Sequence, residues 1–341
     1  MTNLYVISWT PGAGKTALCV GIGTHLKRHN KKVGYFKPLV PATGIDKDAQ
    51  FIHQVLGLEE PVEALCPFQF TTEALTAEDF PTKLIKAYTT VAKDKDVVLL
   101  EGLGGLVDDK HLQASYQIAN TLDAKMVILV PYSTDLLWER VNFCIGMFAQ
   151  RLLGIVISRV PQGRIESSYT TMVSLFQRGG IKVLGVLPEE RLLLGVSVAE
   201  LAEHLQAEVL CCPKASSGLV ENLMIGALSV DPGVDYFARK ANKAVITRGE
   251  RPDMQLAALA TSTKCLILAG GIAPIPQVLR WAEDKETPIL LVKEDSLSTV
   301  AKIEEVFLQA RFRQQEKQGK LAQILEQRFD FATLYQSLEL Q

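Results

Sequence analysis

A glycine-rich stretch near the start of the chain carries the strongest chemical signal. Residues 8–16 read Ser-Trp-Thr-Pro-Gly-Ala-Gly-Lys-Thr, directly after an apolar run and before a helical pattern. Glycines let backbone N–H groups surround phosphate oxygens, a lysine reaches the β- and γ-phosphates, and a Ser or Thr hydroxyl binds Mg²⁺. Trp9 stands where the usual spacing has its first glycine. The stretch therefore predicts a phosphate-binding loop rather than a chance turn, with a nucleotide contacted by Gly12, Ala13, Gly14, Lys15 and Thr16.

Two further charged side chains follow apolar runs that we interpret as strands. Lys37 lies in Phe-Lys-Pro at the end of the second run, and Glu101 opens Glu-Gly-Leu-Gly-Gly after a later one. Doubly wound sheets bind ligands at the carboxyl ends of their strands, and an acidic residue there holds Mg²⁺ in phosphate-transferring proteins. A surface lysine and a structural glycine turn are the competing interpretations.

Short apolar runs alternate with amphipathic stretches along the first two thirds of the chain. After Lys15, apolar residues recur every four positions, as one buried helical face requires, and 77–93 shows a second helical pattern. This alternation predicts an α/β fold, a parallel sheet covered by helices on both faces. The runs that we interpret as buried strands are Leu4–Trp9, Val33–Leu39, Val97–Leu100, Met126–Tyr132, Leu153–Val160 and Val183–Leu187.

The chain changes character near Cys212–Gly218, a small and polar stretch with Pro213 and Gly218. We place a domain boundary there and predict a first domain over 1–214, a smaller α/β domain over 216–310 and a helical extension over 311–341. The extension shows two helical patterns, which we expect to pack on the body of the protein. Beyond the boundary we expect strands at Lys243–Thr247, Cys265–Leu268 and Pro288–Val292, and helices at Asp231–Lys240, Arg251–Ala260, Ile275–Glu286 and Ser298–Ala310.

Composition excludes several classes of protein. The 341 residues carry a formal net charge of −2, which argues against a dedicated nucleic-acid binder, and 48% hydrophobic with 22% charged residues argues against disorder. No apolar run is long enough to span a membrane, and the first residues do not resemble a signal peptide. The six cysteines show no metal-ligand spacing. We expect a cytoplasmic protein, without nucleic-acid or membrane partners, that forms a homo-oligomer.

The phosphate loop, Phe36-Lys37-Pro38, Asp48-Ala49 and Glu101-Gly-x-Gly-Gly together resemble dethiobiotin synthetase and its relatives, among them cobyrinic acid diamide synthases. The likeness is strongest to the N-terminal region of long bacterial phosphotransacetylases. Residues 153–161 and 184–193 read like phrases of that region, and 220–228 and 244–258 resemble the DRTGG domain that follows it there. Since the chain stops near 341, we expect the acyltransferase domain to be absent.

The resemblance implies a P-loop NTPase-like fold that binds ATP, or another nucleotide, and Mg²⁺. It implies that Lys15 and Lys37 are catalytic cations contacting phosphate or carbamate, and that Thr16, Asp48 and Glu101 hold Mg²⁺. Ser158 stands where dethiobiotin synthetase has an asparagine that reads the base, and a hydroxyl cannot replace its donor–acceptor pair. The family also has a glycine at the position of Ser8, and segment 61–76 does not resemble its diamine-binding part.

In the second domain, three polar or glycine-rich stretches follow predicted strands or precede helices, where small ligands and anions bind. Helix capping by Pro252 and Asp253 is the competing explanation for the first of them. The resemblance implies a ligand-sensing module for an unidentified metabolite. These stretches are 248–253, 261–263 and 268–271.

Three functions remain open from the sequence. The departures at Ser8, Trp9 and Ser158 favour a nucleotide-binding regulatory protein with weak ATPase activity, linked to acetyl-phosphate or related central metabolism. The retained Lys15, Lys37, Asp48 and Glu101 favour an ATP-dependent ligase or amidoligase. A binding scaffold with an inactive site is the third.

Overall fold

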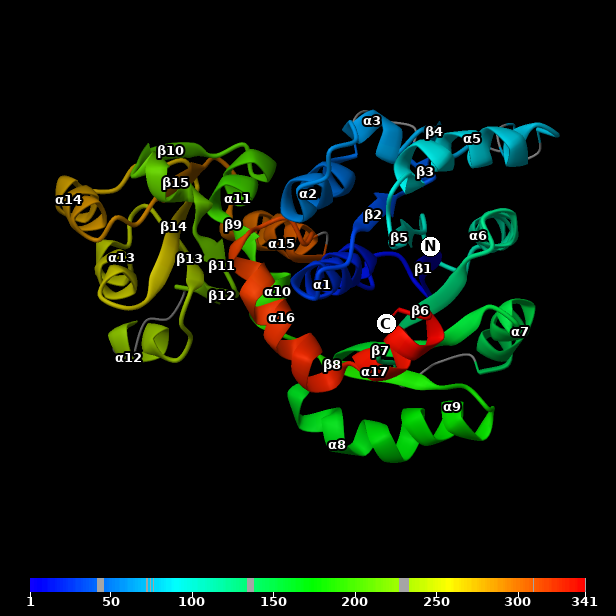
Figure 1. Cartoon of the computed structure of the whole chain (residues 1–341). Helices are drawn as coiled ribbons and strands as arrows, with labels where there is room; N and C mark the ends of the chain where they lie inside the picture. The colour runs from blue at the N-terminus through cyan, green and yellow to red at the C-terminus, as the bar shows by residue number, and fades with distance from the viewer. Residues whose placement is uncertain are drawn as a thin grey trace. The chain divides into compact units, whose positions relative to one another are not determined.

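The chain forms two compact units in the computed structural model, which describes residues 1–41, 46–71, 73, 75, 77–133, 138–226, 233–308 and 310–340 (Figure 1). The first unit contains Met1–Glu189 and Phe312–Gln341, so the chain leaves it and returns. The second unit contains Glu190–Arg311.

The first unit is built on a six-stranded sheet in which all neighbouring strands are parallel, in the order β2-β5-β1-β6-β7-β8. Its central strands are buried on both faces, as their continuous apolar runs predict. Two short strands, β3 (Leu39–Val40) and β4 (Phe68–Gln69), form a separate parallel pair. The strands of the main sheet are β1 (Thr2–Ser8), β2 (Val33–Phe36), β5 (Val97–Glu101), β6 (Lys125–Pro131), β7 (Leu152–Val160) and β8 (Val183–Pro188).

Helices cover both faces of this sheet (Figure 1). On one face α1 packs against α2 and α16, and on the other α5 packs against α6, which also contacts α7. A 3₁₀ turn (Gln162–Arg164), α8 (Ile165–Ser168), a π-helical turn (Tyr169–Val173) and α9 (Ser174–Arg178) connect β7 to β8. The remaining helices are α1 (Lys15–Arg28), α2 (Lys47–Leu56), α3 (Val62–Leu65), α5 (Phe80–Ala92), α6 (Asp109–Thr121), α7 (Trp138–Phe148), α16 (Glu316–Arg328) and α17 (Phe331–Ser337).

The C-terminal residues are an integral part of the first unit. The α1–α16 contact is so close that a Cβ on Gly21 would come within 2.1 Å of Leu325 Cδ1. Beyond α16, Phe329 forms a β-bridge to Gly185 of β8, and Asp330 donates its backbone N–H to Leu184. The two predicted C-terminal helices therefore exist and pack on the body of the protein.

The second unit has a five-stranded sheet in the order β10-β15-β14-β13-β12, with only β10 antiparallel to its neighbour. Two short strands, β9 (Val196–Ser197) and β11 (Leu219–Val220), form a separate antiparallel pair. The strands of the sheet are β10 (Glu208–Cys211), β12 (Asn222–Ile225), β13 (Lys243–Arg248), β14 (Thr263–Ala269) and β15 (Ile289–Val292). Its helices are α10 (Arg191–Leu194), α11 (Val198–His204), α12 (Gly233–Ala238), α13 (Pro252–Leu259), α14 (Pro276–Asp284) and α15 (Ser296–Leu308), with a 3₁₀ turn at Pro213–Ser217.

Side chains of the second sheet alternate between two apolar clusters. Ala244 and Ile246 of β13 face α11 and α15, whereas Val245 between them faces the cluster of α12, α13 and α14. This is the two-residue period of a strand covered on both faces. The fold is therefore the predicted α/β sheet with helices on both faces, followed by a second, smaller α/β unit.

The division of the chain differs from the sequence-based boundary. The first compact unit ends at Glu189, about 25 residues before 214, and the extension over 311–341 belongs to that unit from Phe312 onward. The reason is a long-range pairing: β10, which the sequence-based boundary places in the first domain, lies antiparallel to β15 in the second sheet. An edge strand of this kind carries no local sign of the sheet that it joins.

The predicted strand Val33–Leu39 is interrupted after Phe36. Pro38 has no N–H for a sheet ladder, and the N–H of Lys37 donates to Leu65 outside the main sheet. The predicted helix at 231–240 begins at Gly233, and its first two residues lie outside the described part of the chain.

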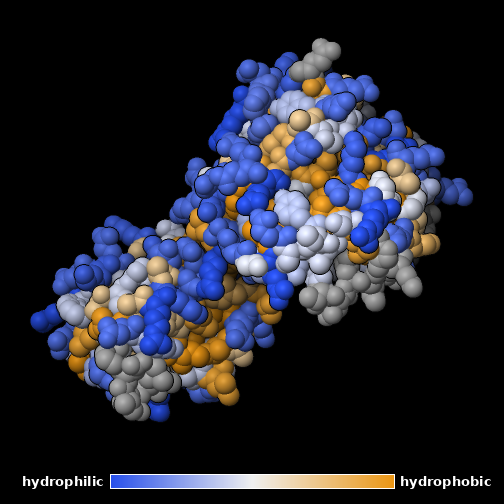
Figure 2. Space-filling view, turned by 90° about the horizontal axis from the view of Figure 1, so that it is seen from below, coloured by the Kyte–Doolittle hydropathy of each residue, from blue (hydrophilic) through white to orange (hydrophobic). Residues whose placement is uncertain are grey.

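Hydrophilic side chains cover most of the surface on the face drawn in Figure 2, with hydrophobic ones in smaller groups between them. Among the residues that the structure describes, no helix has the length and hydrophobicity needed to cross a bilayer.

Candidate phosphate and metal site

The predicted phosphate loop joins β1 to α1. Gly12 has φ +72° and Gly14 φ +108°, a backbone region in which side chains other than glycine are strained. Gly14 caps α1 without a side chain, so the first N–H groups of the helix face the loop. A Cβ on Gly105 would come within 2.7 Å of the Thr10 Cα, which places the glycine-rich loop after β5 directly against the phosphate loop.

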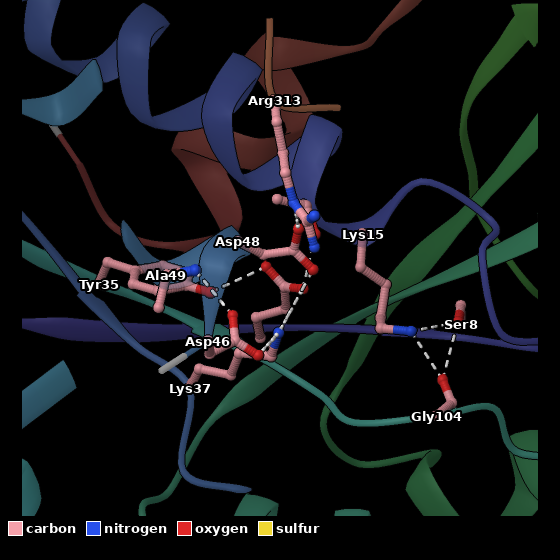
Figure 3. Close-up of polar contacts among 11 residues, drawn as sticks. Ser8, Lys15, Tyr35, Lys37, Asp46, Asp48, Ala49, Gly104 and Arg313 are labelled. Carbon is pink, nitrogen blue, oxygen red and sulfur yellow. Dashed lines mark hydrogen bonds and ion pairs between the residues drawn. The ribbon is translucent and has the colours of Figure 1, made fainter. Parts of the chain in front are cut away.

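Lys15 opens α1 and is largely buried, with 9% of its surface exposed. Its ammonium donates to the Ser8 hydroxyl at 2.9 Å and to the Gly104 carbonyl at 2.7 Å. Figure 3 shows Lys15 turned toward these two residues. Ser8 in turn donates to the Thr10 carbonyl at 2.7 Å. The lysine therefore spans the phosphate loop and the loop after β5, next to a helix N-terminus that favours anions.

Glu101 ends β5, and 2% of its surface is exposed. One carboxylate oxygen accepts the Thr16 hydroxyl at 2.8 Å, and the other accepts the Tyr35 hydroxyl at 2.9 Å. Burial, and then the charge of Glu101, raise the pKa of Tyr35 well above its usual value, so that it remains a donor. These bonds fix the buried carboxylate beside the first turn of α1.

Lys37 lies just past β2 and brings three carboxylates together. Its Nζ is 2.8 Å from Asp46 and 3.7 Å from both Asp48 and Glu101. Burial alone would lower the pKa of Lys37, but Glu101, Asp46 and Asp48 outweigh it and raise that pKa above its ordinary value. The lysine is therefore a permanent cation inside a ring of acidic groups.

Asp46 and Asp48 come from the start of α2. Asp46 is the N-cap of this helix, and its carboxylate accepts the Ala49 N–H at 2.8 Å. Asp48, in the first helical turn, also accepts a 2.8 Å hydrogen bond from Nε of Arg313, a residue of the returning C-terminal segment (Figure 3). The cluster thus combines three carboxylates with two cations.

The donor types suit Mg²⁺, which takes oxygen ligands and usually needs only one or two carboxylates besides substrate phosphates and water. Thr16, Asp48 and Glu101 supply a hydroxyl and two carboxylates around Lys37. Within the described ranges, no group of three His, Cys, Asp or Glu side chains is arranged to hold a metal by itself. The residues fit a cation shared with a phosphate ligand, and they do not form a closed protein cage.

Ser158, the predicted base-reading position, contacts the backbone of the phosphate loop. Its hydroxyl donates to the Ala13 carbonyl at 3.1 Å, and 5% of its surface is exposed. The neighbouring Arg159 contacts the Gly12 carbonyl through its guanidinium and has φ +55°. Both residues thus hold the backbone of the phosphate loop from the end of β7.

The structure gathers the predicted residues in two adjacent groups, one around Lys15 and one around Lys37. Sequence reasoning missed Tyr35 and Arg313. A tyrosine in a fully buried strand is a detectable signal, because its hydroxyl needs a partner. Arg313 carries no such signal, since it is separated from Asp48 by 265 residues.

Two of the predicted ligand stretches of the second unit, 248–253 and 268–271, lie at the carboxyl ends of β13 and β14. The third, 261–263, does not: it follows α13 and leads into the start of β14. Arg248 is ion-paired with Glu250 at 3.1 Å and Arg251 with Asp253 at 2.7 Å. Thr261 accepts a hydrogen bond from Lys243 at 2.8 Å. Among the described cysteines, Cys19, Cys66, Cys211, Cys212 and Cys265 are free thiols.

The chain is similar to known proteins over most of its length. It is 23% identical over 333 residues to a phosphate acetyltransferase of Nitrosomonas europaea, covering 89% of this chain and 47% of that protein. It is 24% identical over 376 aligned positions to the phosphate acetyltransferase of Haemophilus influenzae, covering 96% of this chain and 52% of that protein. This chain spans about half the length of these curated relatives. A solved structure, the MinD cell division protein of Aquifex aeolicus, matches with 16% identity and a TM-score of 0.38, covering 57% of this chain and 84% of that one.

Two family profiles divide the chain between them. The AAA domain profile matches residues 2–197, which is more than half of the chain, and the DRTGG domain profile matches 200–306. The first profile ends with β9 and the second begins within α11, near the division of the compact units. The chain therefore belongs to the AAA domain family and carries a DRTGG domain behind its P-loop domain, in the arrangement of the N-terminal region of long phosphotransacetylases.

Proposed function

We propose that this protein is a nucleotide-binding regulatory module that binds a nucleotide with Mg²⁺ at the phosphate loop and hydrolyses it slowly or not at all. The observation that carries the proposal is the meeting of three parts at the ends of β1 and β5. These are the N-terminus of α1 with two left-handed glycines, the ammonium of Lys15, and the hydrogen-bonded pair Thr16–Glu101.

Each part has a role toward a triphosphate. The backbone N–H groups of the loop and the helix end would donate hydrogen bonds to phosphate oxygens, and Lys15 would exchange its Ser8 and Gly104 contacts for the β- and γ-phosphates. Thr16, Asp48 and Glu101 would hold Mg²⁺, which when bound neutralises phosphate charge. Lys37 keeps the three carboxylates together while its own charge faces the same region.

Two observations favour slow turnover and weak base selection. The Ser158 hydroxyl already donates to Ala13, so it offers no two-point contact to adenine. The Asp48 carboxylate is already bonded by Arg313 and approached by Lys37, so the acidic groups are largely neutralised by the chain itself. Both are features of a site that binds a ligand rather than one tuned for rapid phosphoryl transfer.

The second unit supports a sensing role. The DRTGG profile matches 200–306, and phosphate acetyltransferases are among the relatives that align with most of this chain. We therefore propose that the second unit binds a small metabolite linked to acetyl phosphate or related central metabolism. We propose further that the protein is a cytoplasmic homo-oligomer.

A ligase or amidoligase is the second candidate. The observation favouring it is the buried cation of Lys37 at the end of β2, beside the predicted metal ligands Asp48 and Glu101. A cation placed there would suit a negatively charged acyl or carbamate group as well as a phosphate.

Calorimetry with ATP and GTP, each with and without Mg²⁺, tests the proposal. We expect binding of both nucleotides, and a loss of about tenfold or more in Lys15→Ala, since a hydrogen bond to a charged group is worth roughly 1.5–3 kcal/mol. Lys83→Ala is the matched control, because this lysine is ion-paired with Asp79 on the surface of α5.

Phosphate release, with Glu101→Gln as control, separates the two candidates. We expect turnover well below the enzyme median of about 10 s⁻¹. Turnover near that median, or a hundredfold preference for ATP, would contradict the regulatory function and favour the ligase. If neither nucleotide binds at millimolar concentration, both candidate functions are contradicted.

A further inference from the structure

An arginine from the returning C-terminal segment reaches the predicted metal position. Arg313 Nε lies 2.8 Å from Asp48 Oδ1 (Figure 3), and the side chains of Arg313 and Asp48 are 30% and 16% exposed. A hydrogen bond between two opposite charges at this depth is stronger than a surface ion pair. Arg313 therefore occupies one oxygen of a carboxylate that the proposed function assigns to Mg²⁺.

The charges around Asp48 make this contact consequential. Asp46, Asp48 and Glu101 carry three negative charges, and Lys37 and Arg313 carry two positive ones. With Arg313 in place the net charge of the cluster is −1, and without Arg313 it is −2. Because a divalent cation is attracted by net negative charge and by vacant carboxylate oxygens, Arg313 opposes metal binding in both respects.

The fold holds Arg313 against the same helix that carries Asp48. The preceding Phe312 is buried and packs edge-on against Phe51 of α2, with ring centroids 6.0 Å apart. Arg313 lies in the non-helical stretch before α16, which begins at Glu316. Rotation about its side-chain bonds is enough to move the guanidinium away from Asp48.

Chain connectivity gives this arginine an unusual place. The second unit ends at Arg311, and only Phe312 stands between that unit and Arg313. A change in the path of the chain as it leaves the second unit would therefore act on Phe312 and Arg313 first.

We infer that Arg313 is a built-in counter-ion that holds Asp48 until a divalent cation displaces it, and so sets the metal requirement of the phosphate loop. The inference rests on the proposed function, in which Asp48 is a metal ligand. Arg313 is a positioning residue in this scheme, acting on ligand binding through Asp48.

The test compares Arg313→Ala with Arg313→Lys in the full chain. Binding of Mn²⁺ alone is followed by the loss of its free-ion spin-resonance signal, and binding of ATP by calorimetry over a Mg²⁺ series. We expect Arg313→Ala to lower the Mn²⁺ dissociation constant by about tenfold, the scale of one charge-assisted hydrogen bond. The half-saturating Mg²⁺ for ATP binding should fall with it, whereas Arg313→Lys should stay near the wild type because the charge is kept.

Arg28→Ala is the control, since Arg28 forms an ion pair with Glu326 that also joins the C-terminal segment to the rest of the first unit, but on the exposed surface. It should leave both metal readouts unchanged. Equal or weaker Mn²⁺ binding in Arg313→Ala, with ATP binding intact, would overturn the inference and leave the proposed function standing. Tighter Mn²⁺ binding in that variant, with no ATP binding by any form, would overturn the proposed function and leave the role of Arg313 standing.

Discussion

Lys37 shows how a single buried side chain organises the candidate site. Its ammonium lies within 3.7 Å of three carboxylates that come from α2 and β5, and its side chain is 5% exposed. Charges so deeply buried are tolerated only when they are paired. Removing the lysine leaves three acidic groups facing one another.

We predict that Lys37→Met lowers the free energy of unfolding by about 3 kcal/mol at neutral pH, the usual cost of breaking a buried ion pair. Mg²⁺ should raise the free energy of unfolding more in Lys37→Met than in the wild type, because the carboxylates freed from the lysine attract the cation. Urea unfolding with and without Mg²⁺ measures both effects. Lys83→Met, at an exposed pair, is the control, and equal losses in the two variants would contradict the prediction.

Lys243 is a contrasting buried lysine, at the start of β13. It is fully buried and donates to the Thr261 hydroxyl at 2.8 Å and the Ser262 carbonyl at 2.9 Å, both neutral acceptors. Burial lowers the pKa of Lys243 from 10.5 to about 8. The folded chain therefore releases this proton at a lower pH than the unfolded chain does.

A pH dependence follows from that difference. Between pH 8 and 10.5 the unfolded state binds more protons at Lys243, so its contribution to stability should rise with pH through this window. We predict that the wild type gains stability there relative to Lys243→Met, measured as urea midpoints across the window. Lys264→Met, at an exposed position of the neighbouring strand β14, is the control and should run parallel to the wild type. Parallel curves for Lys243→Met would refute the assignment.

The contact between α1 and α16 sets how the C-terminal segment closes on the first unit. Gly21 lies on the buried face of α1, where a Cβ would meet Leu325 at 2.1 Å. Leu325 is itself buried, so its side chain has little room to move aside. Glycine is needed at this position for close approach of the helices and not for its backbone conformation.

Gly21→Ala should therefore destabilise the chain by about 1–3 kcal/mol, the usual cost of overpacking. Gly319→Ala offers a matched control in the partner helix, since nothing lies within 4 Å of its Cβ position. That substitution should stabilise by roughly 0.5–1 kcal/mol, because alanine is the better helix former. Thermal unfolding of both variants measures the pair, and destabilisation of the same size in both would argue against close packing at Gly21.

The path of the chain makes the first unit discontinuous, because the second unit is inserted between Glu189 and Phe312. The returning segment contributes a buried apolar set to the first unit. A chain without this segment would expose the surfaces that it covers. The buried members are Phe312, Leu321, Ile324, Leu325, Phe329, Leu334 and Leu338.

Deletion of 312–341 should thus lower the melting temperature of the first unit and leave that of the second unit unchanged. Two-domain chains unfold in separable transitions when each part has its own core, as the second unit does in its two apolar clusters. Differential scanning calorimetry, with the isolated fragment 190–311 as reference, resolves the two. An unchanged profile after deletion, or a fragment 190–311 without a cooperative transition, would contradict this assignment of the chain to units.

Local chemistry accounts for what could be predicted from the sequence. The phosphate loop is a contiguous motif, and Lys37 and Glu101 could be placed because Lys37 stands near the end of one apolar run and Glu101 directly follows another. Parallel strands end at one edge of a sheet, so these side chains had to meet near the loop. Short apolar runs also predicted the six main strands of the first unit and the three central strands of the second.

The rest depends on contacts between residues far apart in the chain. Strand β10 shows no preference for one sheet over another in its own residues, so the division after Glu189 follows only from its pairing with β15. Arg313 meets Asp48 across 265 positions, and nothing in the residues around either one indicates the other. Local sequence motifs determined the positions of the acidic groups and of the phosphate loop in the fold. Long-range packing decided which cations neutralise them, because that depends on where the chain returns after the second unit.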